Sequence, residues 1–357
     1  MQTRSTKPDV LVLYNHVGDD EYEKLRSVDP ASLGFTPEYP IHVATVREEI
    51  EAVVNGLAQE GYAARSVNVQ EDLGILEDAL RSRPDAVFNL VEFFHDRPGM
   101  ESAVAALYEL YQIPYTGAGP FALTLCGRKG YTKQVLLANG VPTPRFRLLS
   151  RPALPRRHRL RYPLIVKPAR EDASAGIGKE SVVRDYGSLM TQVASLFTRF
   201  SPPILVEEYI EGRELHVSIL GNDPPVVLPI IEFDFSDLPP DHPRIISYEA
   251  KWDPLKEVYH RVHSICPAPL SSRLRRRIEE LSIQAFRITG CRDYARLDLR
   301  LDAGNHASIL EVNPNPDLTE GVSFMESAEK SGRTFSETLA TIVEFALSRN
   351  PRAENRS

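Results

Sequence analysis

The residues best suited to chemistry lie in a segment of alternating character near the end of the chain. The segment 295–301 reads ARLDLRL. Its leucines stand at odd-numbered positions, and Arg296, Asp298 and Arg300 stand at the even-numbered positions between them. Successive side chains of a strand point to opposite faces, so the pattern predicts a β-strand with one apolar and one charged face. The charged face would present a carboxylate between two guanidinium groups.

A second strand, predicted over 306–313, places Glu311 and Asn313 on one face. If a short turn joins the two strands into a hairpin, Asp298 falls opposite 309–311, and two carboxylates and an amide converge. Hard oxygen ligands that remain open to water and phosphate suit Mg²⁺. Two prolines in the following NPNPD fix the chain directly after these ligands. A hairpin with a merely polar, solvated face is the alternative.

A loop rich in small residues, 171–179, follows a strand that contains Lys167. Backbone N–H groups of small residues can approach phosphate oxygens closely, and a lysine supplies positive charge. The loop does not match the Walker A pattern, because Ala173 and Glu180 stand where that pattern needs Gly and Ser or Thr. An ordinary flexible hairpin loop is the alternative.

The elements that must position these groups fall into successive blocks. Strands alternate with helices in the first third, which predicts a parallel sheet with helices on its faces; the strands are 9–15, 62–69 and 85–92, and the helices are 46–60 and 71–83. A second block has a helix over 128–140, strands over 163–168, 180–184 and 203–210, and a helix near 187–199. The last block adds helices over 270–289, 323–331 and 334–348 to the hairpin. The segment 116–122 is predicted to be a turn between the first two blocks.

Composition limits the class of protein. The chain has 357 residues, of which 42% are hydrophobic and 25% charged, and its net charge is −7. These values predict two to three globular domains and exclude a strongly basic nucleic-acid surface. No apolar run approaches the roughly 18–20 residues that cross a bilayer, and the start lacks a signal peptide, so we expect a cytoplasmic protein. Three cysteines far apart predict free thiols.

Seven segments occur in the order found in the ATP-grasp superfamily, and together they make the chain resemble its D-alanine–D-alanine ligase branch over about residues 85–347. They are 113–119 (IPYTGAG), 128–144 (RKGYTKQVLLANGVPTP), 165–179 (IVKPAREDASAGIGK), 204–220 (ILVEEYIEGRELHVSIL), 248–252 (YEAKW), the ARLDLR hairpin and 311–319 (EVNPNPDLT). The resemblance implies an α/β (α+β) ATP-grasp fold of three domains. These are an N-terminal parallel-sheet domain (8–120), a central lid domain (121–215) and a C-terminal catalytic domain (216–350).

The resemblance also implies roles for individual residues, with ATP held between the central and C-terminal domains. The ATP-binding residues would be Lys129 and Lys167 at the phosphates, Ser174 in the closing loop, Glu207 at the adenine amino group, backbone at Tyr209 and Ile210, and Glu214 at the ribose. Lys251 would reach the γ-phosphate, and Arg296 would stabilise the oxyanion. Asp298, Glu311 and Asn313 would hold two Mg²⁺ ions, which Mn²⁺ can replace. The loops 171–179 and 236–257 would close over the site.

The residues expected at the substrate site differ from those of the D-alanine–D-alanine ligase branch. The Gly-rich stretch with a Ser and a Glu that orients the first amino acid is missing after the first strand, where 14–24 reads YNHVGDDEYEK. Asp317 stands where the branch has a Gly that receives the carboxylate of the second amino acid, and it would repel a carboxylate. Glu92, Asn315 and Asp317 are the candidate substrate-binding residues. Glu92 could bind a substrate ammonium group, and capping of the end of a buried strand is the alternative.

The sequence therefore predicts an ATP- and Mg²⁺-dependent carboxylate–amine ligase that joins small amino-acid-like substrates through an acyl phosphate. A true D-alanine–D-alanine ligase with a remodelled acceptor site is one alternative. An ATP-binding module without turnover and a phosphotransferase acting on a hydroxyl are two others. We expect no nucleic-acid or membrane partner, and a homodimer is compatible with the resemblance.

Overall fold

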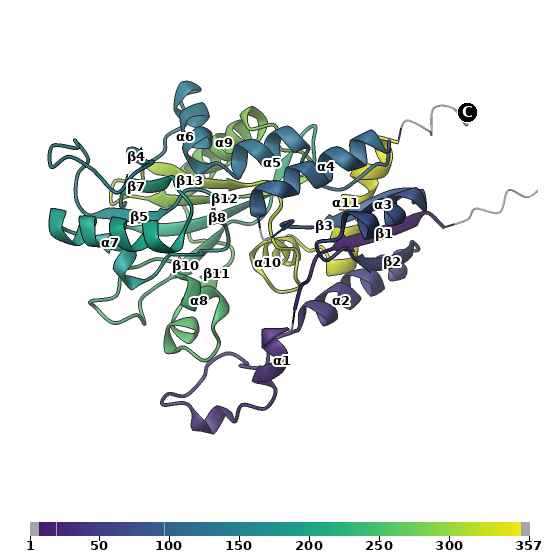
Figure 1. Ribbon diagram of the computed structural model, residues 1–357, viewed down its shortest axis with the longest axis horizontal. Coiled ribbons are helices and arrows are strands. Elements are labelled where there is room, and N and C mark those ends of the chain that lie inside the picture. The colour runs from purple at the N-terminus through teal and green to yellow at the C-terminus, as the bar shows by residue number, and fades with distance from the viewer. Residues whose placement is uncertain (1–6, 19, 96, 351–357) are drawn as a thin grey trace, which may run out of the picture.

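Three β-sheets organise the protein (Figure 1). The computed structural model describes residues 7–18, 20–95 and 97–350. The strands of the three sheets lie within 9–90, 146–208 and 213–313, in the order expected from the sequence. The first sheet is parallel and the other two are antiparallel, which confirms the predicted α/β (α+β) architecture.

The first sheet has the strand order β2-β1-β3, and both pairs are parallel. The strands are β1 (Asp9–Tyr14), β2 (Ala63–Asn68) and β3 (Ala86–Leu90), and helices α3 (Leu73–Arg81) and α4 (Glu101–Leu110) cover one face. The other face packs against α2 (Val46–Gln59) and, from the far end of the chain, α10 (Ser323–Lys330) and α11 (Phe335–Ser348). Parallel strands need apolar cover on both faces, and here the C-terminal helices share the cover of one face with α2.

The second sheet has the order β4-β7-β5-β6 and is antiparallel. Its strands are β4 (Phe146–Leu149), β5 (Leu164–Pro168), β6 (Val182–Val183) and β7 (Ile204–Glu208), and α7 (Tyr186–Arg199) packs its apolar stripe against them. The basic segment 151–163 is a loop, but its Leu154 and Leu160 are buried in the core of this sheet. These two leucines anchor a segment whose arginines remain at the surface.

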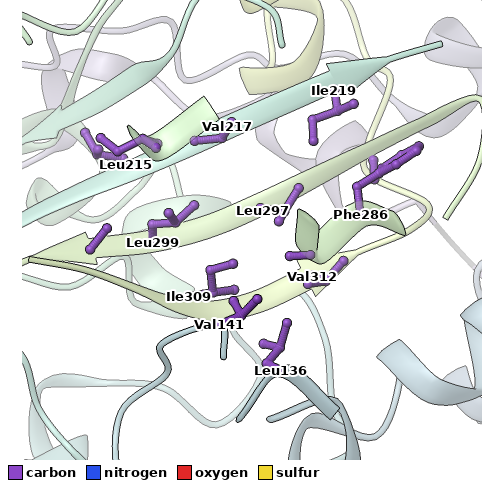
Figure 2. Packing of buried hydrophobic residues seen from close by; sticks show 14 of the residues in the cluster. Leu136, Val141, Leu215, Val217, Ile219, Phe286, Leu297, Leu299, Ile309 and Val312 are labelled. Atoms are coloured by element: carbon purple, nitrogen blue, oxygen red, sulfur yellow. The ribbon is translucent and has the colours of Figure 1, made fainter. Parts of the chain in front are cut away.

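The third sheet has the order β11-β10-β8-β12-β13, with β9 paired to β8. Its strands are β8 (Arg213–Leu220), β9 (Val226–Val227), β10 (Ile231–Asp234), β11 (His263–Ile265), β12 (Tyr294–Leu301) and β13 (Ala307–Asn313). Figure 2 shows its apolar face, where Leu297 and Leu299 of β12 pack among side chains of β8, β13 and two neighbouring helices. Those helices are α6 (Lys129–Ala138) and α9 (Ser272–Ile288). The opposite face of this sheet is therefore left for the charged residues.

Several short elements were not predicted. They are α1 (Glu21–Leu25), α5 (Pro120–Cys126), α8 (Tyr248–Trp252) and the 3-10 helices η1 (Pro30–Ser32), η2 (Pro98–Met100), η3 (Lys179–Ser181) and η4 (Glu257–Arg261). The strands β4, β8, β9, β10 and β11 were not predicted either. The predicted turn over 116–122 is correct only up to Gly119, because Pro120 begins α5. Proline is well suited to the first helical position, where its missing N–H leaves no bond unmade. The three cysteines are free thiols.

Among the residues that the structure describes, no helix has the length and apolar character needed to cross a membrane.

Candidate active site

The hairpin β12–β13 brings the predicted metal ligands face to face. Asp298 pairs with Glu311, and Arg296 pairs with Asn313. The register shifts after Asp298, so that Leu299 pairs with Ile309 and Leu310 is the extra residue of a bulge. The bulge places Ile309 in the apolar core while Glu311 stays on the charged face. The predicted pairing of Asp298 with 309–311 is thus confirmed at Glu311.

Arg296 and Asp298 form a two-bonded ion pair on the charged face of β12. Arg296 Nε donates to Asp298 Oδ1 at 2.8 Å, and a second guanidinium nitrogen donates to Oδ2 at 3.0 Å. His216 of β8 lies on the other side, with Nε2 3.4 Å from Asp298 Oδ1 and Nδ1 3.0 Å from Ser323 Oγ. Burial alone would raise the pKa of Asp298, but Arg296 and His216 outweigh it and lower that pKa. Asp298 is therefore ionised.

Lys129 connects the start of α6 with both the small-residue loop and the hairpin. Its Nζ lies 2.9 Å from Asp172 Oδ1 and 3.2 Å from Glu311 Oε2, and it also donates to Glu171 O at 2.6 Å. Burial by itself would lower the pKa of Lys129, but the charges of Asp172 and Glu311 outweigh it and raise the pKa. Lys129 is therefore a fixed cation beside a proposed metal ligand.

Glu207 of β7 is enclosed by two lysines. Lys167 Nζ lies 2.7 Å from Glu207 Oε1, and Lys133 Nζ lies 2.8 Å from Oε2 and donates to Thr143 Oγ1 at 2.8 Å. Burial alone would raise the pKa of Glu207, but the two lysines lower it to about 2. Sequence reasoning did not select Lys133, although it lies one helical turn after Lys129 on α6. The contact of Glu207 with an adenine amino group stays a proposal, since both carboxylate oxygens are engaged here.

The predicted nucleoside-binding residues lie in and after the connection between β7 and β8. Glu214 on β8 lies 3.3 Å from the guanidinium of Arg300, whose carbon sits 4.7 Å from the centre of the Tyr209 ring. The Tyr209 amide donates to Pro163 O at 2.9 Å, so that N–H is already used. If this connection binds an adenine ring, the hydrogen bonds would therefore come from the Tyr209 carbonyl and from the backbone of Ile210.

The two loops expected to close are in contact. Ser174 Oγ donates to Ile246 O at 3.0 Å, Trp252 Nε1 donates to Ala173 O at 2.8 Å, and the Tyr248 amide donates to Ile177 O at 2.9 Å. Ala173 and Ser174 both have positive φ values, 54° and 61°. Such conformations cost free energy in residues with side chains and persist where surrounding contacts hold them. The contacts between the loops supply that restraint.

Lys251 lies in α8, which begins after Ser247, whose side chain accepts a hydrogen bond from the Ala250 amide. The Lys251 ammonium sits 4.6 Å from the centre of the Trp252 ring. Burial and the charge of Arg296 lower the pKa of Lys251, while Asp317, Asp298 and Glu92 act in the opposite direction. Lys251 therefore belongs to the same group of charges as the hairpin.

The candidate substrate residues meet on the N-terminal side of this group. Glu92 follows β3, and its amide donates to Asn15 Oδ1 at 3.0 Å. Asn315 donates to Glu101 Oε1 at 2.7 Å and accepts from the Tyr294 hydroxyl at 3.0 Å, so a substrate would have to replace one of these bonds. Asp317 accepts from the Thr319 amide at 2.8 Å.

The charged face suits Mg²⁺ by the chemistry of its donors. Asp298 and Glu311 are 17% and 20% exposed, and an amide oxygen follows at Asn313. Mg²⁺ keeps several water ligands and takes one or two carboxylates together with phosphate oxygens, so a small, partly open donor set is appropriate. Within 7–18, 20–95 and 97–350, no group of three or more His, Cys, Asp or Glu side chains could hold a metal ion by itself. A metal here would share its coordination with a ligand.

Comparison with known proteins agrees with this geometry. The family model described as the D-ala D-ala ligase C-terminus matches residues 135–344. A D-alanine–D-alanine ligase of Methylobacterium radiotolerans is 34% identical over 306 residues, covering 83% of this chain and 91% of that protein. An uncharacterised protein of Sinorhizobium fredii, y4sG, is also 34% identical, over 269 residues that cover 75% and 76% of the two chains.

Among solved structures, the D-alanine–D-alanine ligase of Bacillus anthracis complexed with ATP superposes with a TM-score of 0.71 at 21% identity. The match covers 98% of this chain and 100% of that one. The sheets and the charged hairpin thus define an ATP-grasp protein. Within that class, the chain belongs to the D-alanine–D-alanine ligase family.

Proposed function

We propose that this protein is an ATP- and Mg²⁺-dependent ligase that joins the carboxylate of one amino-acid-like substrate to the amine of another. The products would be an amide, ADP and phosphate. The observation that carries the proposal is the charged face of the hairpin, where Lys129, Arg296 and Lys251 surround the carboxylates of Asp298 and Glu311. This arrangement can hold a polyphosphate and its metal ions together.

The chemistry requires an activated carboxyl group, because a carboxylate is a poor electrophile. Lys129, Lys167 and Lys251 would bind and orient the phosphates of ATP, so that the γ-phosphoryl group meets the substrate carboxylate. Mg²⁺ bound at Asp298, Glu311 and Asn313 would offset the charge of the transferring group. Arg296 would then stabilise the oxyanion as the amine attacks the acyl phosphate.

The contact between the loops 171–179 and 236–257 supports this chemistry. An acyl phosphate is hydrolysed by water, so a ligase must shield it until the amine arrives. Ser174 and Trp252 join the two loops through hydrogen bonds that opening would break. We propose that nucleotide exchange occurs when these loops open. The parts that would move are the three units 8–120, 121–215 and 216–350.

Formation of D-alanyl-D-alanine is the second candidate, because the relative from Methylobacterium radiotolerans bears that name over most of this chain. Asp317 argues against it, since a carboxylate at that position repels the carboxylate of a second amino acid. The two candidates differ in substrate and share the same chemistry.

Hydroxylamine trapping tests the proposal without knowledge of the amine. Hydroxylamine attacks acyl phosphates, so incubation of the protein with Mg·ATP and a panel of amino acids should yield a hydroxamate together with ADP for at least one acid. A phosphorylated product without hydroxamate would indicate a phosphotransferase. ATP binding without ADP release across the panel would indicate a binding module. Arg275→Gln, on the exposed side of α9, is a suitable control variant, because α9 packs on the apolar face of the sheet.

A further inference from the structure

A buried arginine lies next to a proposed metal ligand on the charged face of β12. Arg300 is 2% exposed and is among the largest fully buried side chains of the described residues. It follows Asp298 by two residues, so the two side chains point to the same face of the strand about 7 Å apart. Across the sheet, Arg300 pairs with Glu214 of β8, and Asp298 pairs with His216. The pair Arg300–Glu214 is therefore one step beyond Asp298 along the charged face.

Three groups from three different segments hold the Arg300 side chain. Its Nη2 lies 3.3 Å from Glu214 Oε2 and also donates to Arg244 O, and its guanidinium carbon sits 4.7 Å from the centre of the Tyr209 ring. The Tyr209 hydroxyl donates to the same Arg244 carbonyl at 2.9 Å. A flat guanidinium fork suits this combination of ring stacking and two oxygen acceptors, and the compact ammonium of lysine does not. The position of Glu214 is thus tied to the shape of the arginine as well as to its charge.

These contacts compensate the buried charge of Arg300 only in part. Its Nε is buried and has no hydrogen-bond partner among the described residues. An unpaired donor on a buried cation costs free energy, and an apolar side chain would fill the same strand position without that cost. The requirements of the fold therefore do not explain an arginine here, which points to a role in the chemistry of the site.

The partner carboxylate of Glu214 keeps one oxygen available. Oε2 faces Arg300, whereas Oε1 accepts no hydrogen bond from residues 7–18, 20–95 and 97–350. Burial raises the pKa of Glu214, and the charge of Arg300 acts against that rise, followed by a smaller effect of Lys167. An oriented carboxylate with an unused oxygen is a strong acceptor for a hydroxyl group.

The side chains along this face follow the order of the parts of a nucleotide. Asp298 lies at the proposed phosphate and metal site, the pair Arg300–Glu214 is the next step along the sheet, and the Tyr209 ring lies against Arg300. In ATP the ribose, with its two neighbouring hydroxyl groups, directly follows the phosphates. The unused oxygen of Glu214 is therefore suitably placed to accept a hydrogen bond from a ribose hydroxyl.

We propose that Arg300 is a positioning residue that fixes Glu214 as the acceptor of a ribose hydroxyl, and that it thereby makes the protein select ribonucleotides over deoxyribonucleotides. The inference rests on the proposed function, which places ATP at the charged face. Arg300 acts through Glu214 and does not itself contact the nucleotide. Because Arg300 also donates to the Arg244 carbonyl in the loop 236–257, the ribose acceptor is linked to the loop that carries Lys251.

Calorimetric titration of the whole chain with nucleoside diphosphates and Mg²⁺ tests the inference without turnover. The ligands are ADP, 2′-deoxy-ADP and 3′-deoxy-ADP, which share the base and the phosphates and differ in one hydroxyl group. We expect the wild type to bind ADP about tenfold or more tightly than at least one of the deoxy ligands, because a hydrogen bond to a charged acceptor is lost. Equal affinity for all three ligands overturns the inference.

The same substitution at two arginines assigns the effect to Arg300. Arg300→Lys keeps the buried positive charge, so that the protein still folds, but it removes the planar fork, and the preference for ADP should fall to about threefold or less. Arg213→Lys is the matched control and should keep the wild-type preference, because Arg213 pairs with Glu232 on the side of the sheet that carries Leu301.

A weaker affinity of Arg300→Lys for all three ligands, with the wild-type preference retained, would indicate a merely structural role and overturn the assignment. Absence of ADP binding by the wild type would refute the proposed function together with the inference. Binding of ADP without a preference among the three ligands refutes the inference alone.

Discussion

Replacement of Glu207 by glutamine should destabilise the protein by about 3 kcal/mol at neutral pH. Glu207 and Lys133 are each 1% exposed, and Lys167 is 7% exposed, so water cannot replace the lost charge. Glutamine has nearly the same shape and can still accept hydrogen bonds. The substitution therefore isolates the charge that neutralises two buried ammonium groups.

Two routes give a similar magnitude. The pKa of Glu207 falls from 4.5 to about 2 on folding, which at about 1.4 kcal/mol per pH unit corresponds to about 3 kcal/mol. Removing one partner of a buried ion pair typically costs about 3–5 kcal/mol. Because the folded-state pKa is lowered, this stabilisation is fully present above the unfolded pKa of 4.5 and is lost as the pH falls toward 2.

Equilibrium urea unfolding of three proteins measures the effect: the wild type, Glu207→Gln and Glu208→Gln. Glu208 is the next residue of β7, and its partners Arg145 and Arg161 are 59% and 81% exposed, so its replacement should cost less than about 1 kcal/mol. The difference between the two variants should also shrink as the pH is lowered from 5 to 3.

The reasoning would be refuted by a free energy of unfolding for Glu207→Gln within about 1 kcal/mol of that for Glu208→Gln. A difference that does not change with pH in the acidic range would be equally damaging. It would show that packing, rather than the charge of Glu207, stabilises the two lysines.

Three further predictions follow from the site and the fold. Asp298→Asn and Glu311→Gln should each lower ADP release about 10²-fold or more with the native circular dichroism spectrum retained, and normal turnover in either would remove the metal assignment. Gly212→Ala should cost about 2 kcal/mol or more in urea unfolding, because the new methyl group would overlap the Leu301 carbonyl oxygen at a φ of 150°, whereas Gly332→Ala, with open space around it, should cost less. Burial and the charges of Asp317 and Asp20 raise the pKa of Glu49 to about 8, which favours the protonated folded state, so thermal stability should fall as the pH rises from about 4.5 to 8. A pH profile in Glu49→Gln as steep as that of the wild type would contradict this last prediction.

The parts of the fold that depend on local periodicity could be predicted from the sequence. The alternation in 295–301 gives β12 its two faces, and the apolar spacing in 270–289 gives α9 its buried stripe. These patterns predict structure because neighbouring residues along the chain decide them. The order of the motifs along the chain likewise indicated the D-alanine–D-alanine ligase family.

Contacts between distant segments were outside the reach of such patterns. Lys133 is polar and has the spacing of an ordinary helix residue, yet it is buried because Glu207 of another element meets it. The cover of the N-terminal sheet by α11, and the hydrogen bond from the Tyr39 amide to His260, also depend on packing across more than 200 residues of sequence. No local pattern records such a meeting.

The sequence by itself thus determined the charged hairpin, the small-residue loop and the family, because each is written in residues close together in the chain. Only the tertiary structure decided how the charges balance. It paired Asp298 with Arg296 and Glu311 with Lys129, and it enclosed Glu207 between two lysines. The physical reason is that electrostatic free energy depends on distance and burial, which are properties of the folded arrangement rather than of the order of residues.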